Sequence, residues 1–278
     1  MALHILKKSE RENLFTLFTE LKKCSDQYPE GTTEVMTALR CLKAVHSNAI
    51  EDKRVDRVFL QILLHGAGIP DKSKISTRYQ KAKFEINGQE EMLRWLESLA
   101  NDKSELSLSL LLEMHKRVFG KSWPDGSGKF RQSEVAIQGM QHLPPHHSKI
   151  QEYLHQSFLT INERLKPIQE LNRDSFFEVL RISADVHYAV AHIHPFSDGN
   201  GRIARAVGDY VLLLKGMFYD VIMSDYRDFY LDAMEECSAT DSTPLYHFIE
   251  YSYLETLQRI SGFFKLVAEN ETSSPLRS

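Results

Sequence analysis

Residues 194–205 read His-Pro-Phe-Ser-Asp-Gly-Asn-Gly-Arg-Ile-Ala-Arg, and this stretch decides the fold and the site that the sequence predicts. Its proline disfavours helical geometry at His194, so we expect the preceding helix to end there. Gly199 and Gly201 permit backbone angles that other residues resist, and they leave room for a ligand beside the main chain. A new helix is expected to begin near Arg202. The stretch therefore predicts a ligand-binding loop between two helices.

The loop carries the groups that phosphate chemistry requires. The first amides of the expected helix point unpaired into the loop and offer a seat for phosphate oxygens. Arg202 and Arg205 share one helix face, and two guanidiniums beside such a seat suit a polyphosphate. Asp198 offers a hard oxygen of the kind that Mg²⁺ accepts. Histidine titrates near neutral pH, so His194 could take a proton from an incoming hydroxyl. Each residue alone has an ordinary structural explanation, but their order together indicates a nucleotide site.

This order matches in full the signature His-Pro-Phe-x-(Asp/Glu)-Gly-Asn-Gly-Arg-x-x-Arg, through which the chain resembles the Fic family. The likeness covers about residues 104–253, including Gly-Lys-Phe-Arg at 128–131 and the segments 135–145 and 230–249. It implies an all-α, mostly helical Fic-type fold with a small β-hairpin flap over the active site. It also implies a Mg²⁺-dependent protein adenylyltransferase, which moves AMP from its co-substrate ATP to a serine, threonine or tyrosine hydroxyl of a target protein.

The resemblance assigns roles to the residues of the loop. His194 would be the general base, and Arg202 would bind the departing pyrophosphate as the second catalytic residue. Asp198 would hold Mg²⁺, and Phe196 would anchor the loop in the core. The nucleotide-binding residues would be Gly199, Asn200, Gly201, Arg202 and Arg205, with Arg205 on the γ-phosphate and the Asn200 side chain on the α- and β-phosphates.

One segment breaks the helical pattern and predicts the flap. Residues 134–138 alternate in polarity, and a Gly-Met pair follows that can turn. Extended backbone at Val135, Ala136 and Ile137 could pair with a strand of the target protein. The alternative is an edge ribbon with only a structural role.

An upstream segment predicts a control element. Ser-Asn-Ala-Ile-Glu at 47–51 resembles the (Ser/Thr)-x-x-x-Glu-(Gly/Asn) inhibitory motif of many Fic proteins. Ser47 and Glu51 would be the inhibitory residues, with Glu51 competing with the γ-phosphate for Arg205. The chain departs from the motif at Asp52, where glycine or asparagine is expected. The alternative is that Glu51 is an ordinary exposed helix residue.

Helical periodicity predicts the remaining elements and the domain plan. We expect an N-terminal helical region at 1–103, a catalytic core at 104–268 and a flexible tail at 269–278. A loop is expected at 71–79. Helices are expected at about 33–47, 56–65, 90–99, 107–119, 150–166, 175–192, 203–214, 228–237 and 244–267, after an amphipathic segment around Phe15 to Lys22.

Composition restricts the class of protein. The chain has 278 residues, of which 42% are hydrophobic and 26% charged, as in an ordinary globular protein. A formal net charge of -4 gives no reason to expect binding to nucleic acid or anionic membranes. Three dispersed cysteines, no signal-peptide pattern and no long apolar run indicate a cytoplasmic protein with reduced thiols. A homo-oligomer is compatible with these features.

Other functions remain open at this point. The site could transfer a different phosphate-containing group, or it could remove AMP from a modified protein with Glu51 positioning water. The chain could instead be a nucleotide-responsive binding module without catalysis. A zinc hydrolase built on His187, His192 and His194 is disfavoured, because their spacing matches no recognised zinc motif. His187 is more simply expected to pack near the loop.

Overall fold

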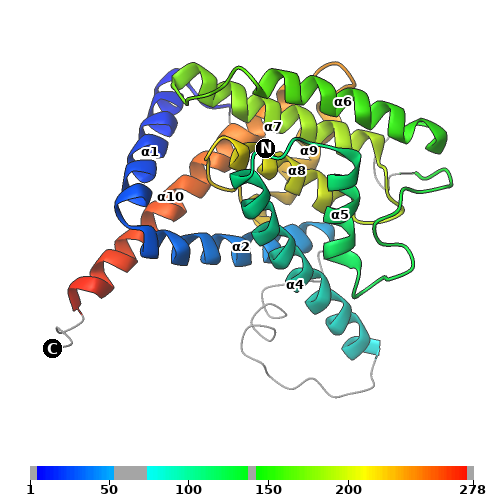
Figure 1. Ribbon diagram of the computed structural model, residues 1–278, viewed down its shortest axis with the longest axis horizontal. Coiled ribbons are helices and arrows are strands. Elements are labelled where there is room, and N and C mark those ends of the chain that lie inside the picture. Colours follow the sequence, from blue (N-terminus) through cyan, green and yellow to red (C-terminus); the bar gives the residue numbers. More distant parts are fainter. Residues whose placement is uncertain (1–4, 53–73, 137–141, 274–278) are drawn as a thin grey trace.

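A computed structural model describes residues 5–52, 74–136 and 142–273. These residues form helices and connecting loops without a sheet, which confirms the predicted all-α fold (Figure 1). The α-helices in chain order are α1 (Lys8–Gln27), α2 (Pro29–Glu51), α4 (Lys74–Asn101), α5 (Leu108–Phe119), α6 (Ile150–Leu165), α7 (Arg173–Ile193), α8 (Asn200–Leu214), α9 (Arg227–Glu236) and α10 (Thr243–Ser273). Short 3₁₀ turns, η1 (His147–Lys149) and η2 (Ser224–Tyr226), precede α6 and α9.

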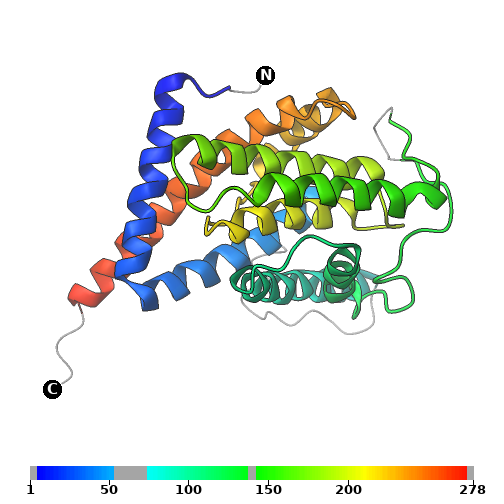
Figure 2. The same ribbon diagram turned by 45° about the horizontal axis from the view of Figure 1, so that its top comes forward.

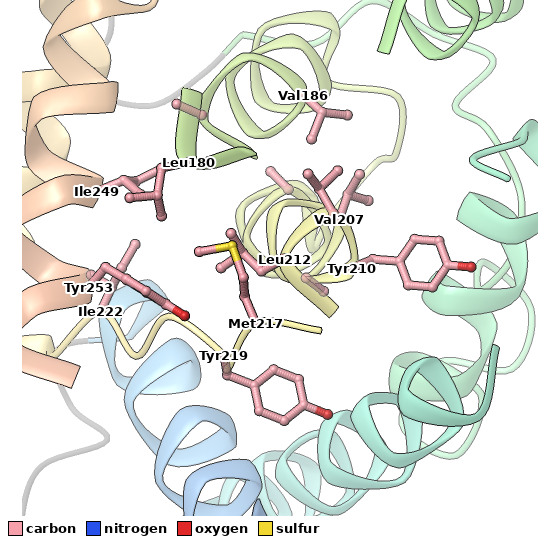
Figure 3. Close-up of a cluster of buried hydrophobic side chains, with 14 of the residues drawn as sticks. Leu180, Val186, Val207, Tyr210, Leu212, Met217, Tyr219, Ile222, Ile249 and Tyr253 are labelled. Atoms are coloured by element: carbon pink, nitrogen blue, oxygen red, sulfur yellow. The ribbon is translucent and has the colours of Figure 1, made fainter. Parts of the chain in front are cut away.

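Helix α8 is the centre of the fold. Its residues from Arg202 to Leu212 are buried on every side of the helix, the charged ones included. Helices α7, α4, α2 and α5 contact it. Figure 3 shows Val207 and Leu212 of α8 among buried side chains of the surrounding elements, with Tyr210 pointing to the other side of the helix. The loop that precedes α8 is therefore attached to the most firmly packed element of the protein.

The two N-terminal helices are docked on this core. Helix α1 lies along α10, and α2 runs across the molecule to contact α10, α4 and α8 (Figures 1 and 2). Lys43 on α2 places its Nζ 2.6 Å from Asp209 Oδ2 of α8, with both side chains buried. Arg40 on α2 reaches Glu90 and Glu97 of α4 at 3.1 and 2.8 Å. A buried ion pair to α8 and partly buried ion pairs to α4 thus fix the position of α2.

Most predicted helix boundaries agree with the structure within a few residues, for local reasons. Helix α7 ends at Ile193 because of the following His-Pro pair, as predicted, and α8 begins two residues earlier than expected. The loop predicted at 71–79 is wrong for residues 74–79, which begin the long helix α4. Helix α10 continues through Ser273 into the segment expected to be a flexible tail. The helix predicted at 56–65 lies outside the described residues.

The predicted hairpin flap has no strand in the described part of the chain. Val135 and Ala136 lie in irregular structure, and Ile137 falls outside the described residues. The flap and its docking role therefore stay predictions. Among the described helices, none combines the length and the apolar character that a membrane crossing requires.

Candidate active site

His194 stands at the junction between α7 and the loop. It adopts a left-handed conformation with φ 53° and ψ 59°, which ends the helix and turns the ring away from it. Its Nδ1 lies 3.3 Å from the carbonyl oxygen of Ala191, so this nitrogen carries the hydrogen and Nε2 keeps the lone pair. Burial lowers the pKa of His194 below its ordinary value, with the charge of Arg131 adding to the effect. The ring is neutral near pH 7 and ready to accept a proton.

Arg131 holds the backbone of this junction, and the sequence analysis assigned it no role. It is 2% exposed, its Nε donates to the carbonyl of His194 at 2.8 Å, and its amide donates to the carbonyl of Pro195 at 2.9 Å. Its other nitrogens donate to the carbonyls of Ser133 and Pro145, on the two sides of the flap segment. One side chain therefore ties the catalytic loop to both ends of that segment.

Phe196 is buried, as the expected core anchor, and its ring stacks on His115 of α5 with centroids 3.9 Å apart. The amide of Gly128 donates to His115 Nδ1, so Nε2 donates to the carbonyl of Asp198 at 3.0 Å. Burial lowers the pKa of His115 to about 4, which keeps this arrangement neutral. No local pattern in the sequence marks His115, because its role depends on packing across distant segments.

Asn200 closes the loop on itself. Its side chain accepts from the amide of Phe196 and donates to the carbonyl of Phe196, both at 2.8 Å. The side chain is buried and both its polar ends are occupied within the loop. The structure therefore places this side chain as a support of the loop, whereas the resemblance placed it on the phosphates.

Asp198 has the exposure and the chemistry that a Mg²⁺ ligand requires. Its side chain is 56% exposed and faces an open cavity. Oδ1 accepts from the amide of Gly199 at 2.6 Å, and no described residue bonds to Oδ2. A hard carboxylate oxygen is thus available beside the loop, and it fits a magnesium ion that is shared with phosphate oxygens.

Arg205 lies on α8 under the end of α2. Its Nε donates to Ser47 Oγ at 2.9 Å, and Nη2 donates to the Ser47 carbonyl at 2.8 Å and to Glu51 Oε1 at 2.6 Å. The Arg205 side chain is 1% exposed and that of Glu51 is 36% exposed. Burial acts to raise the pKa of Glu51, but the charges of Arg205 and Arg202 hold it below its ordinary value. Glu51 is thus ionised on the guanidinium at neutral pH.

Glu51 also occupies the space above the glycine loop. A Cβ at Gly201 would lie 2.3 Å from Glu51 Oε1, so a larger residue there would displace the carboxylate. Asp52 is the C-cap of α2 with φ -125° and ψ 101°, extended angles that any residue adopts. The departure from the inhibitory motif at this position therefore costs no backbone strain. The carboxylate bonds to the guanidinium that the resemblance assigns to the γ-phosphate.

Arg202 faces away from Arg205, toward α4 and α5. Its Nη1 donates to Glu85 Oε2 at 2.5 Å and to Asn48 Oδ1 at 3.0 Å. Its guanidinium lies over the ring of Phe119, 4.4 Å from the centroid. Arg202 and Glu85 are both buried, and the sequence analysis assigned Glu85 no role. No spacing in the sequence relates a residue of α4 to this arginine.

The cavity has a volume of about 870 Å³ and brings part of the predicted site together. Its polar lining includes His194, Ser197, Asp198, Gly201, Arg205 and Glu51, and its apolar lining includes Ile50, Tyr188, Leu231 and Met234. Gly199, Asn200 and Arg202 do not line it. The cavity thus combines charged groups at the loop with apolar side chains from α2, α7 and α9.

The zinc alternative finds no support in the described residues. His187 is buried and its Nε2 lies 2.8 Å from the hydroxyl of Tyr230, next to Arg205, as its expected packing near the loop requires. The one histidine and carboxylate cluster that could hold a metal within the described ranges is Glu134, His146 and His147. It includes none of the histidines considered for zinc.

Comparisons with known proteins identify the domain around this site. Residues 105–212 match the model of the Fic/DOC family. A protein named protein adenylyltransferase Fic from Aedes aegypti is 29% identical over 193 residues, which are 69% of this chain and 36% of that protein. The protein adenylyltransferase fic-1 of Caenorhabditis elegans is 26% identical over 254 residues, 89% of this chain and 46% of that protein. The chain spans less than half the length of these relatives.

Solved structures share the fold. Fic-1 from C. elegans superposes with a TM-score of 0.69 at 22% identity, covering 92% of this chain and 74% of the other. A Fic domain-containing signalling protein from Bacteroides thetaiotaomicron superposes with a TM-score of 0.74 at 18% identity, covering 92% and 97%. The predicted Fic-type helical fold is confirmed by these structures.

Proposed function

Since this chain belongs to the Fic/DOC family, we propose that it transfers AMP from ATP to a hydroxyl side chain of a target protein. The observation that carries the proposal is one cavity lined by His194, Asp198 and Arg205, at the start of a helix whose amides face the loop. Nucleotidyl transfer requires a base, a metal ligand and a cation that binds phosphate. The names of the curated relatives support the same activity.

The proposed reaction follows from this arrangement. The target hydroxyl oxygen attacks the α-phosphorus of ATP, and its proton passes to Nε2 of His194. The bond between the α-phosphorus and the oxygen that bridges to the β-phosphate breaks, and pyrophosphate leaves with that oxygen. Arg202 and Arg205 stabilise the charge that develops on the leaving group. Mg²⁺ held by Asp198 would supply further neutralisation of the phosphate charge.

We further propose that Glu51 inhibits this reaction in cis. Its carboxylate bonds to Arg205 at 2.6 Å and touches Gly201, so it competes with phosphate for the guanidinium. Ser47 strengthens the block, because it occupies Nε and shares Nη2 of the same guanidinium. Helix α2 must shift, or the Glu51 side chain must rotate away from Arg205, before ATP takes its productive position.

The exposed position of Glu51 also favours a second activity of the same site. A carboxylate that lines the cavity could hold a water molecule for removal of AMP from a modified protein. Release of AMP by wild type but not by Glu51→Gly, from a protein that Glu51→Gly has modified, would support this activity.

The proposed function is tested with Mg²⁺ and ATP labelled at either the α- or the γ-phosphate. Wild type is compared with Glu51→Gly, hereafter the released variant, and with His194→Ala in the same background. A cell lysate supplies targets, and self-modification serves as a second acceptor. Label from the α position, increased in the released variant and absent without His194, supports the proposal. Label from the γ position would indicate a kinase-like reaction, and no label in the released variant would refute nucleotidyl transfer from ATP.

A further inference from the structure

The two arginines of the loop are held in opposite ways. On Arg205, Ser47 and Glu51 occupy Nε and Nη2, which form the side-on edge that binds a phosphate with two parallel bonds. On Arg202, Glu85 and Asn48 occupy only Nη1. The Nε of Arg202 is buried and has no hydrogen-bond partner in the described part of the chain. Its Nη2 lies 3.8 Å from Asp198 Oδ1, which is too far for a hydrogen bond.

A buried guanidinium nitrogen without a partner is costly, unless a ligand completes its bonding. The open edge of Arg202 begins at that nitrogen and ends at Nη2, beside the carboxylate proposed to hold Mg²⁺. Phe119 covers one face of the guanidinium. The bonds that Arg202 lacks are of the kind that phosphate oxygens would supply, and its Nη2 lies beside Asp198, which lines the cavity although Arg202 itself does not.

From this geometry we propose that Glu85 is a positioning residue for Arg202, turning its Nε–Nη2 edge toward the leaving phosphates of the nucleotide. The inference rests on the proposed function, because it names the residue that prepares one of its two phosphate-binding arginines. Glu51 and Glu85 then have opposite roles. Glu51 fills the phosphate-binding edge of Arg205, whereas Glu85 takes the far nitrogen of Arg202 and leaves its edge open.

Glu85 is itself held in one orientation. Ser122 Oγ donates to Glu85 Oε1 at 3.0 Å, while Oε2 accepts from Arg202. One turn further along α4, a Cβ at Gly88 would lie 2.5 Å from the carbonyl oxygen of Val118, so glycine is required for α4 to lie this close to α5. The contact between the helices brings Glu85 within reach of α8.

Asn48 links this support to the inhibitory helix. Its Oδ1 accepts from Arg202, and its Nδ2 donates to Gln89 Oε1 on α4 at 2.8 Å. If α2 moves when Glu51 is released, Asn48 leaves with it. Glu85 belongs to α4, so its bond to Arg202 does not depend on the position of α2.

The test measures binding of ADP and of AMP by calorimetry, with Mg²⁺, to the released variant with and without Glu85→Gln. ADP carries the β-phosphate that Arg202 is proposed to bind, and AMP does not. We expect Glu85→Gln to raise the Kd for ADP about tenfold, the effect of a weakened charge-assisted contact, while the Kd for AMP changes less than about twofold. The control is Glu91→Gln, the same change on the same helix at an exposed residue paired with Lys121. It should change neither constant.

A merely structural role for Glu85 would weaken ADP and AMP binding equally, and that result would overturn the inference. An unchanged Kd for ADP would also overturn the inference. A lower Kd for ADP would overturn it as well, because it would make Glu85 a competitor of phosphate like Glu51. The ratio of the two constants does not depend on turnover. If ADP binds as expected but no α-label is transferred, the proposed function fails while the inference about Glu85 stands.

Discussion

Replacement of Glu51 by glycine should release the activity of this protein. The change removes one charge-assisted hydrogen bond of 2.6 Å from Arg205. Such bonds contribute about 1.5–3 kcal/mol. The Glu51 side chain is 36% exposed, so solvent screening reduces this to about 1–2 kcal/mol. Since phosphate must displace the carboxylate, the rate at subsaturating ATP should rise about 5- to 30-fold.

The assay follows α-labelled AMP on protein at a fixed, low ATP concentration. Glu34→Gly is the matched control, because it places glycine at an exposed position of the same helix, away from Arg205. It should leave the rate at the wild-type level. Glu51→Gln separates charge from shape, and it should give a smaller increase than glycine.

A released variant with wild-type activity, in a preparation that binds ATP and unfolds at the wild-type temperature, would refute competition at Arg205. An increase of the same size in Glu34→Gly would show that loosening α2, and not removal of the carboxylate, controls activity.

Three further predictions concern the base, the second inhibitory residue and the docking of α2. In the released variant, His194→Ala should abolish transfer but leave nucleotide binding intact by calorimetry. Because burial lowers the pKa of His194, the rate of the unsubstituted released variant should fall in acid with a midpoint below the ordinary histidine pKa, and a midpoint above that value would contradict this. Ser47→Ala in wild type removes the hydrogen bond from the charged guanidinium of Arg205 to a neutral hydroxyl, so α-label should rise, but by less than Glu51→Gly gives; no increase would remove Ser47 from the inhibitory contact. Lys43→Ala leaves Asp209 without its buried partner and should cost about 3–5 kcal/mol in urea unfolding at pH 8. Burial already raises the pKa of Asp209 to about 6, and without Lys43 this carboxyl is protonated more easily in the folded protein. The loss in unfolding free energy should therefore be smaller at pH 5 than at pH 8, and an equal loss at both pH values would refute this account.

The helices and the chemistry of the loop were predictable from local sequence. Apolar periodicity marked most of the helices, and the His-Pro pair marked the end of α7, because both depend on neighbours within one turn. A phosphate site was indicated by Gly199, Gly201, Asp198, Arg202 and Arg205, because these residues also lie within a few positions of one another. The loop predicted at 71–79 failed because a polar run in a long solvated helix has no apolar stripe to mark it.

The sequence by itself therefore determined the helical class, the position of the loop and the identity of its reactive groups. Only the tertiary structure decided which of these groups share a cavity and which partners hold them. Arg131, His115 and Glu85 are far along the chain from the residues they contact, and no period of the sequence relates them to the loop. Their contacts form because helix packing buries these donors beside acceptors, and a buried donor without an acceptor would destabilise the fold.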